Sequence, residues 1–316
     1  MSKYVVSSSP HLRDNVSTRS IMQDVCIAML PACAAGVLFF GYRAAVILAL
    51  SVAAAVLSEW FYCKAAHQKV SVGDFSAVVT GMLLAMNLPS TAPYWMPIIG
   101  SVIAILLCKM IFGGIGQNFI NPALAARAIL ALSWATVMTS FAPAQFGNLA
   151  GVDAIASATP ISGASKETFT LLQLFLGDCP GTIGETSKIA LLIGAAYLLW
   201  KKVISWHIPA AFLGSFAVCY LLATGFDVNV TLYQLLSGGL ILGAFFMATD
   251  YSSSPATNKG KIVFGLGCGL LLFVFRYCKK TPAEWCSYAI LLMNVASPLI
   301  ERVTGVKSFG EVKKNA

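Results

Sequence analysis

Long apolar runs, separated by short polar stretches, divide the chain into segments that have the length and composition of membrane spans. A helix needs about 20 apolar residues to cross a bilayer, so 316 residues leave room for roughly ten spans. We therefore predict an all-α polytopic membrane protein. The ten segments that the pattern indicates are residues 21–41, 44–62, 75–88, 95–112, 122–141, 188–200, 208–226, 232–249, 261–276 and 285–303.

Two of these segments look too short to cross a bilayer as one straight helix. Residues 75–88 would cover about 21 Å before Pro89 stops the helix, whereas the hydrocarbon core is about 30 Å thick. The eighth segment contains the glycine-rich stretch Gly238–Thr249, which Asp250 follows. We expect both helices to be short or broken.

The short segments occupy the third place in each set of five, and their sequences are similar. Gly81–Asn87 reads GMLLAMN, and Gly243–Thr249 reads GAFFMAT. Because five is an odd number, the second set would enter the membrane from the opposite face. The pattern favours two inverted five-helix repeats, an arrangement in which broken helices meet near the middle of the membrane.

The positions of lysine and arginine favour one orientation. With the N-terminus inside, fourteen of these residues fall on the cytoplasmic side and six outside, as the positive-inside bias predicts. The basic patch Arg276–Lys280 runs against this count. The resulting division is a cytoplasmic segment 1–20, a first five-helix repeat 21–141, an outer loop 142–187, a second repeat 188–303 and a cytoplasmic tail 304–316.

Composition supports a membrane protein and narrows the chemistry. The chain is 58% hydrophobic and only 11% charged, whereas soluble domains carry about 25% charged residues. The net charge of +8 does not point to nucleic acid, because the basic residues gather at span ends. The nine cysteines form no C-x-x-C pair, and the three histidines stand alone, so we expect neither a metal site nor a catalytic histidine.

The outer loop carries the motif D-x-x-x-S-A-T, formed by Asp153, Ser157, Ala158 and Thr159. Small neighbours would leave the threonine hydroxyl open to a modifying enzyme. Spacing alone also fits an unmodified surface loop rich in small polar residues. A nearby S-G-A-S sequence ends at Ser165 but has no acidic residue six positions earlier, so Thr159 is the better acceptor.

A second candidate site lies where the fifth segment begins. Glycines precede Asn118 and Asn121, and Asn121 followed by Pro122 is a typical start of a helix. Arg127 falls on the second turn of that helix. An ionisable residue inside a span indicates a functional site, but it can also snorkel to the interface, and the sequence leaves both interpretations open.

Other polar residues at span ends are weaker candidates. Asn87 near the end of the third segment and Asp250 just after the eighth could contact an ion or a bound cofactor. Asp250 could equally pair with Lys259 or Lys261. We expect Glu59, next to a tryptophan, to anchor its span at the interface.

These motifs, with Ser9-Pro10-His11 near the start and Tyr288–Asn294 near the end, resemble the D subunit of the Rnf complex. The chain is also similar, less closely, to the B subunit of the sodium-translocating NADH:quinone reductase. The resemblance runs from Ser9 to Gly310.

The resemblance implies a protein that carries FMN covalently, as a phosphoester made on Thr159 by a flavin transferase. Asn118, Asn121 and Arg127 would contact cofactor, and some relatives also hold riboflavin. Ala156 departs from the family, which has serine or threonine there. The protein would work with the other members of a complex that passes electrons between reduced ferredoxin and NAD⁺ and moves Na⁺ or H⁺ across a bacterial or archaeal cytoplasmic membrane.

Two other interpretations remain open. Inverted repeats with broken helices also suit a passive channel or transporter for a small polar solute, with no flavin. A structural anchor that only docks partner subunits is the third. The chain shows no site of its own for nicotinamide or ferredoxin.

Overall fold

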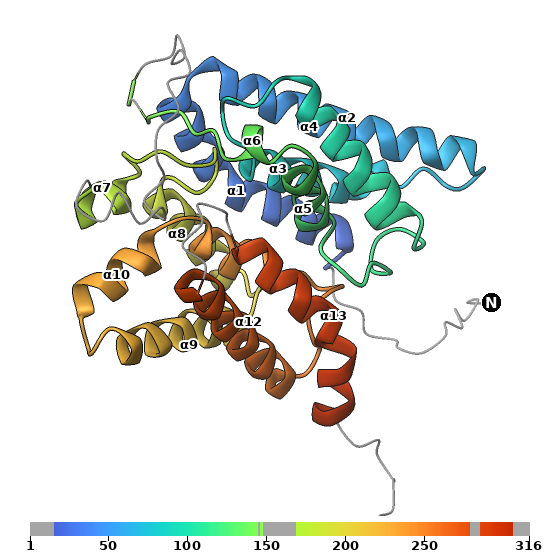
Figure 1. The fold of residues 1–316 in the computed structure, drawn as a ribbon. Coiled ribbons are helices and arrows are strands. Elements are labelled where there is room, and N and C mark those ends of the chain that lie inside the picture. The colour runs from blue at the N-terminus through green and yellow to red at the C-terminus, as the bar shows by residue number, and fades with distance from the viewer. Residues whose placement is uncertain (1–15, 145, 148–168, 279–284, 306–316) are drawn as a thin grey trace, which may run out of the picture.

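The computed structural model describes residues 16–144, 146–147, 169–278 and 285–305, and these ranges are helical apart from their turns and connecting segments. Figure 1 shows two groups of helices side by side, the first coloured blue to green and the second yellow to red. The candidate acceptor Thr159 and its neighbours Asp153, Ser157 and Ala158 lie outside the described residues.

The first group contains two long helices followed by shorter ones. The chain bends at Gly41, between the two long helices, and again after the short α3. The π-helical segment η2 continues α4 without a break. The elements are α1 (Thr18–Phe40), α2 (Tyr42–Ala65), η1 (Val72–Asp74), α3 (Ser76–Met86), α4 (Trp95–Val102), η2 (Ile103–Met110), α5 (Pro122–Ser133) and α6 (Ala135–Met138).

The second group follows the short helix α7 (Leu171–Leu176). A second π-helical segment, η4, lies within it. Its elements are α8 (Lys188–Trp200), α9 (His207–Ala223), α10 (Val228–Leu236), α11 (Leu240–Leu242), η4 (Gly243–Met247), α12 (Asn258–Cys278) and α13 (Cys286–Thr304).

Each of the ten apolar segments predicted from the sequence overlaps a helix. Three of these helices, α1, α2 and α12, are individually long and apolar enough to cross a membrane, and the bent pair α10 with α11–η4 would make a fourth. Five further apolar helices are shorter. An all-helical protein with several apolar helices is therefore confirmed, and the division into ten spans in two inverted sets stays a prediction.

Both expected interruptions are present. α3 has 11 residues and ends at Met86, three residues before Pro89. The eighth segment bends by 67° between α10 and α11, where Gly238 adopts a positive φ of 65°. A positive φ suits glycine because it has no Cβ, so the glycine-rich sequence explains the position of this bend.

Small residues allow the helices to approach closely. Gly265 and Gly269 of α12 face α9, where an added Cβ would lie 2.8 Å from the carbonyl oxygen of Ile208 and 2.6 Å from that of Phe212. Glycines four residues apart are the usual means of close helix packing in membranes. Between the two groups, Gly194 of α8 packs against the carbonyl group of Ala28 in α1.

We expect Gly194→Ala to destabilise the protein by about 1–3 kcal/mol, because the new methyl group would collide with backbone that side-chain motion cannot relieve. Gly214→Ala in α9 is the matched control, since no described atom lies within 4 Å of its Cβ position. It should raise stability by up to about 1 kcal/mol. Thermal unfolding of both variants tests this, and equal melting temperatures would contradict it.

Candidate functional site

Arg127 lies at the junction of three helices. It points from α5 toward the end of α3 and the start of α13, and only 6% of the residue is exposed. Its Nη1 donates to Asn87 Oδ1 at 3.1 Å and to Ser287 Oγ at 2.6 Å. Arg127 is therefore a buried, hydrogen-bonded cation, and the interpretation of a side chain that snorkels to the interface is wrong.

Asn121 connects the start of α5 to the end of the bent span. Its Oδ1 accepts from the backbone N–H groups of Ala123 and Leu124, at 3.1 and 3.3 Å, and so caps the helix as predicted. Its Nδ2 donates to the carbonyl oxygen of Met247 at 3.2 Å. Because Asn87 Nδ2 also lies 3.7 Å from Met247 Sδ, the ends of α3 and η4 meet here.

A small cavity of about 90 Å³ adjoins this junction. Its polar lining comes from two separate parts of the chain, and α1 and α8 contribute apolar walls. Since one water needs roughly 10–15 Å³ in this measure, the cavity has room for several waters or a hydrated cation. Ligand pockets usually begin near 300 Å³, so it is small for a three-ring cofactor. The polar residues that line it are Ser76, Thr80, Lys109, Asn118, Asn121, Thr249, Asp250, Tyr251 and Ser252.

Asp250 lines this small cavity, which we call the inner cavity, and supplies its acidic group. Its carboxylate accepts hydrogen bonds from Ser252 at 3.0 Å and Ser253 at 2.9 Å. Desolvation raises the pKa of Asp250, and the hydrogen bonds oppose that rise. Within the described ranges, neither Lys259 nor Lys261 forms an ion pair with it, so the expected alternative of a paired loop acid is not supported.

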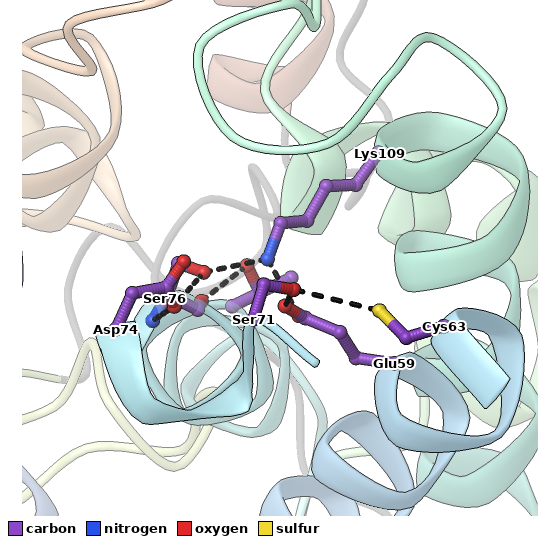
Figure 2. A network of polar contacts seen from close by, with 7 residues as sticks. Glu59, Cys63, Ser71, Asp74, Ser76 and Lys109 are labelled. Atoms are coloured by element: carbon purple, nitrogen blue, oxygen red, sulfur yellow. Dashed lines mark hydrogen bonds and ion pairs between the residues drawn. The ribbon is translucent and has the colours of Figure 1, made fainter. Parts of the chain in front are cut away.

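An ion pair that the sequence did not predict lies beside the same cavity. Lys109 Nζ of η2 is 2.6 Å from Glu59 Oε2 of α2, and the two side chains are 4% and 0% exposed. Lys109 also donates to Ser76 Oγ at 2.6 Å. Figure 2 shows the Lys109 side chain reaching from its helix between these two partners.

Hydrogen bonds extend the pair in both directions. Ser71 Oγ donates to Glu59 Oε1 at 2.5 Å, and Ser76 Oγ donates to Asp74 Oδ1 at 2.5 Å (Figure 2). The expectation that Glu59 anchors its span at the interface is therefore wrong. A buried ion pair is costly to desolvate, and in a membrane protein it marks a functional site by default. Lys109 belongs to a π-helical segment, which is itself common at functional sites.

A second, larger cavity of about 300 Å³, which we call the outer cavity, is lined by Arg127 itself. It reaches the size at which ligand pockets usually begin. Arg127 and Ser287 supply polar groups, and Trp285, Tyr288 and Phe141 supply aromatic walls. The described chain leaves this outer cavity shortly after Phe141, and the D-x-x-x-S-A-T motif follows further along the same connection.

The structure thus brings together most of the candidates that it describes. Asn87 touches Arg127 directly, and Asn118, Asn121 and Asp250 share the inner cavity. The Glu59–Lys109 pair was missed. Its signal in the sequence was an acidic residue and a basic residue that each interrupt an otherwise apolar run.

The fold and these sites define a polytopic helical membrane protein with cavities, each lined by a few polar side chains, between two groups of helices. The chain belongs to the NQR2, RnfD, RnfE family, whose model matches residues 5–310. This confirms the family resemblance.

Named relatives match over nearly their whole length. The chain is 48% identical to the D subunit of the Na⁺-translocating ferredoxin:NAD⁺ oxidoreductase complex of Acetobacterium woodii, over 98% of this chain and 97% of the relative. It is 41% identical to the D subunit of the proton-translocating complex of Clostridium ljungdahlii, over 97% and 96%. It is 33% identical to the D subunit of the ion-translocating oxidoreductase complex of Escherichia coli K12, over 98% and 99%.

We expect Lys109→Met to destabilise the protein by about 3–5 kcal/mol, because it leaves the Glu59 carboxylate buried without its counter-charge. Adding Glu59→Gln should recover most of that loss, since the double variant buries no unpaired charge. Thermal unfolding of both single variants and the double variant forms a double-mutant cycle. Additive losses would show that the two side chains do not interact.

Proposed function

We propose that this chain is the membrane subunit of an ion-translocating ferredoxin:NAD⁺ oxidoreductase complex, and that it carries FMN covalently on Thr159. The relatives are named for that activity, with Na⁺ in one case and protons in another. The observation that carries the FMN part is the D-x-x-x-S-A-T motif on the connection that leaves a cavity walled by Arg127 and aromatic side chains. A flavin transferase would form the phosphoester.

The outer cavity fits a flavin ring by size and by chemistry. Its volume of about 300 Å³ and its walls of Trp285, Tyr288 and Phe141 suit a flat aromatic group. A bound FMN would supply one- and two-electron redox chemistry there. An ester through the phosphate leaves the ring free to enter the cavity, and the tether keeps its local concentration high.

Arg127 supplies the charge that this chemistry requires. Its guanidinium is buried, so little solvent screens its interaction with a negative charge in the outer cavity. Asn87 and Ser287 hold the guanidinium in place, so it is oriented before any charge arrives. Arg127 would therefore favour the reduced, more negative state of a group bound beside it.

The inner cavity is better suited to a cation than to a second flavin. Asp250 and Asn118 offer oxygen atoms, and the volume of about 90 Å³ accepts a small hydrated ion. A non-covalent riboflavin, which the resemblance allows, would need more space. We propose that a cation reaching this cavity offsets negative charge that develops beyond Arg127, which would couple electron transfer to movement of Na⁺ or H⁺.

The proposed placement is a bacterial or archaeal cytoplasmic membrane, with both termini inside and the Thr159 loop outside. Lys109, Lys188 and Arg276 entered the charge count as loop residues, but the structure buries all three. Without them, thirteen basic residues remain inside and four outside, so the bias supporting this orientation becomes stronger. The names of the relatives do not favour the passive channel.

Thr159→Ala should abolish covalent flavin. Protein purified from a host that has the flavin transferase should fluoresce as a denatured gel band under ultraviolet light, and the Thr159→Ala band should be dark. Ser165→Ala, at the neighbouring S-G-A-S sequence, is the matched control and should stay fluorescent. Mass spectrometry of the peptide that covers the loop gives the attachment position. An adduct on Ser165, or a dark wild-type band, would overturn the assignment.

Arg127→Gln should leave the flavin attached but make it harder to reduce. Losing one cation beside the ring should lower its midpoint potential by on the order of 60 mV, the equivalent of a tenfold change for a one-electron couple. Arg127→Lys keeps the charge and should restore part of the shift. Spectroscopic redox titration of the fluorescent variants measures it. An unchanged potential in Arg127→Gln would place the ring elsewhere.

A further inference from the structure

The bend in the eighth segment leaves helix-end carbonyl groups inside the protein. α10 ends at Leu236, and the chain turns through 67° before α11 and η4 continue. The last carbonyl groups of a helix have no partner within it and carry the negative end of the helix dipole. In an apolar environment these groups need another partner, because water is not available to them.

Two buried cations donate to carbonyl groups of the last turn of α10 and of the bend that follows it. Arg276 of α12 donates to the carbonyl oxygens of Gln234 at 2.7 Å and Ser237 at 3.1 Å. Lys188, the first residue of α8, donates from Nζ to the carbonyl oxygen of Gly238 at 2.9 Å. Arg276 and Lys188 are 7% and 1% exposed. Arg276 is therefore not the outward-facing basic residue that the sequence suggested.

The Lys188 ammonium donates to two backbone carbonyl oxygens. Besides Gly238, it contacts the carbonyl oxygen of Glu185. The buried Glu185 carboxylate is on the same short segment, where it accepts from the backbone N–H of Thr182 at 2.9 Å. In the described part of the chain, the buried hydroxyl oxygens of Thr182 and Thr186 have no hydrogen-bond partner. Backbone carbonyl oxygens at the end of a broken helix are the kind of ligand that holds Na⁺ in transporters.

We propose that this bend is a site for a monovalent cation, and that its resident ion is the ammonium group of Lys188. The ammonium carries the same charge as Na⁺ and bonds to the same carbonyl oxygens. Because it is tethered to α8, it is present at a high effective concentration and excludes a free ion. The site should therefore be closed to Na⁺ in the natural protein and open to Na⁺ once the ammonium is removed.

This assignment is independent of the flavin. It predicts that the choice between Na⁺ and H⁺, in which the relatives' names differ, is not made at this bend while Lys188 is present. The bend would hold α8, α10 and α12 together through the hydrogen bonds that Lys188 and Arg276 donate to its carbonyl groups. The transported Na⁺ or H⁺ would cross the protein elsewhere.

Lys188→Ala in the purified complex tests the proposal. Thermal unfolding is followed in NaCl and in choline chloride at equal ionic strength. The variant should melt at a lower temperature than the natural protein in choline chloride. Na⁺ should raise its melting temperature saturably, by roughly 5 °C. Lys261→Ala, at a half-buried lysine near the start of α12, is the control for general salt effects and should respond equally to both salts.

Two further variants keep the test decisive. Lys188→Met fills the space without a charge, so it should lose stability equally in both salts. Lys188→Ser leaves room for Na⁺ and adds a hydroxyl ligand, so it should respond as Lys188→Ala does. A Na⁺-specific rise that is no larger in Lys188→Ala than in the natural protein overturns the proposal. So does failure of both small variants to fold in NaCl, where Na⁺ should replace the ammonium.

Discussion

The structure depends on satisfying helix ends within an apolar interior. α3 and α10 both end inside the protein, and their last carbonyl groups need donors that water does not supply. At α3 the donors are backbone N–H groups, from Gly184 to Met86 at 2.8 Å and from Ile183 to Leu88 at 3.0 Å. At α10 the donor is the side chain of Arg276, and Lys188 donates to Gly238 in the bend that follows. The segment between α7 and α8 contacts the end of α3 through Ile183 and Gly184. Lys188, which immediately follows this segment, contacts the bend after α10.

The buried basic side chains differ in what neutralises them. Lys109 has an acidic partner, Glu59, whereas Arg276 is held by carbonyl oxygens of a helix end, which carry only partial charge. Both lie in the last turn of the helix that follows the interrupted helix of their group. That helix is the continuous α4–η2 after α3, and α12 after α10–η4. The two groups of helices therefore bury a cation at similar positions. The cost of removing the cation from water is offset by a carboxylate in the first group and by backbone carbonyl oxygens in the second. Of these two cations, Lys109 is the one that lines the inner cavity.

Much of the fold could be predicted from the sequence, and the site could be predicted only in part. Apolar runs locate helices because a membrane protein must bury or lipid-cover every residue of a span, and the Asn121-Pro122 pair fixes the start of α5. The Glu59–Lys109 pair could not be predicted, because 50 residues separate its members and only tertiary packing aligns α2 with η2. Arg276 was misread for a related reason: a basic residue at a span end looks the same whether it meets water or a buried helix end.

The position of Arg127 gives a magnitude for coupling between the two cavities. Asn121 at the inner cavity and Arg127 at the outer one are six residues apart on α5, which is about 9 Å along the helix. A negative charge in the outer cavity and a cation in the inner one would thus be about 10–15 Å apart. At an effective dielectric constant of about 20, they attract by roughly 1–2 kcal/mol, or about tenfold in cation affinity. This is enough to bias ion binding by redox state without moving a helix. Arg127 attracts a negative charge in the outer cavity and repels a cation in the inner one, so removing it should make reduction harder and cation binding tighter. Electron affinity and ion affinity therefore respond to the same side chain in opposite directions.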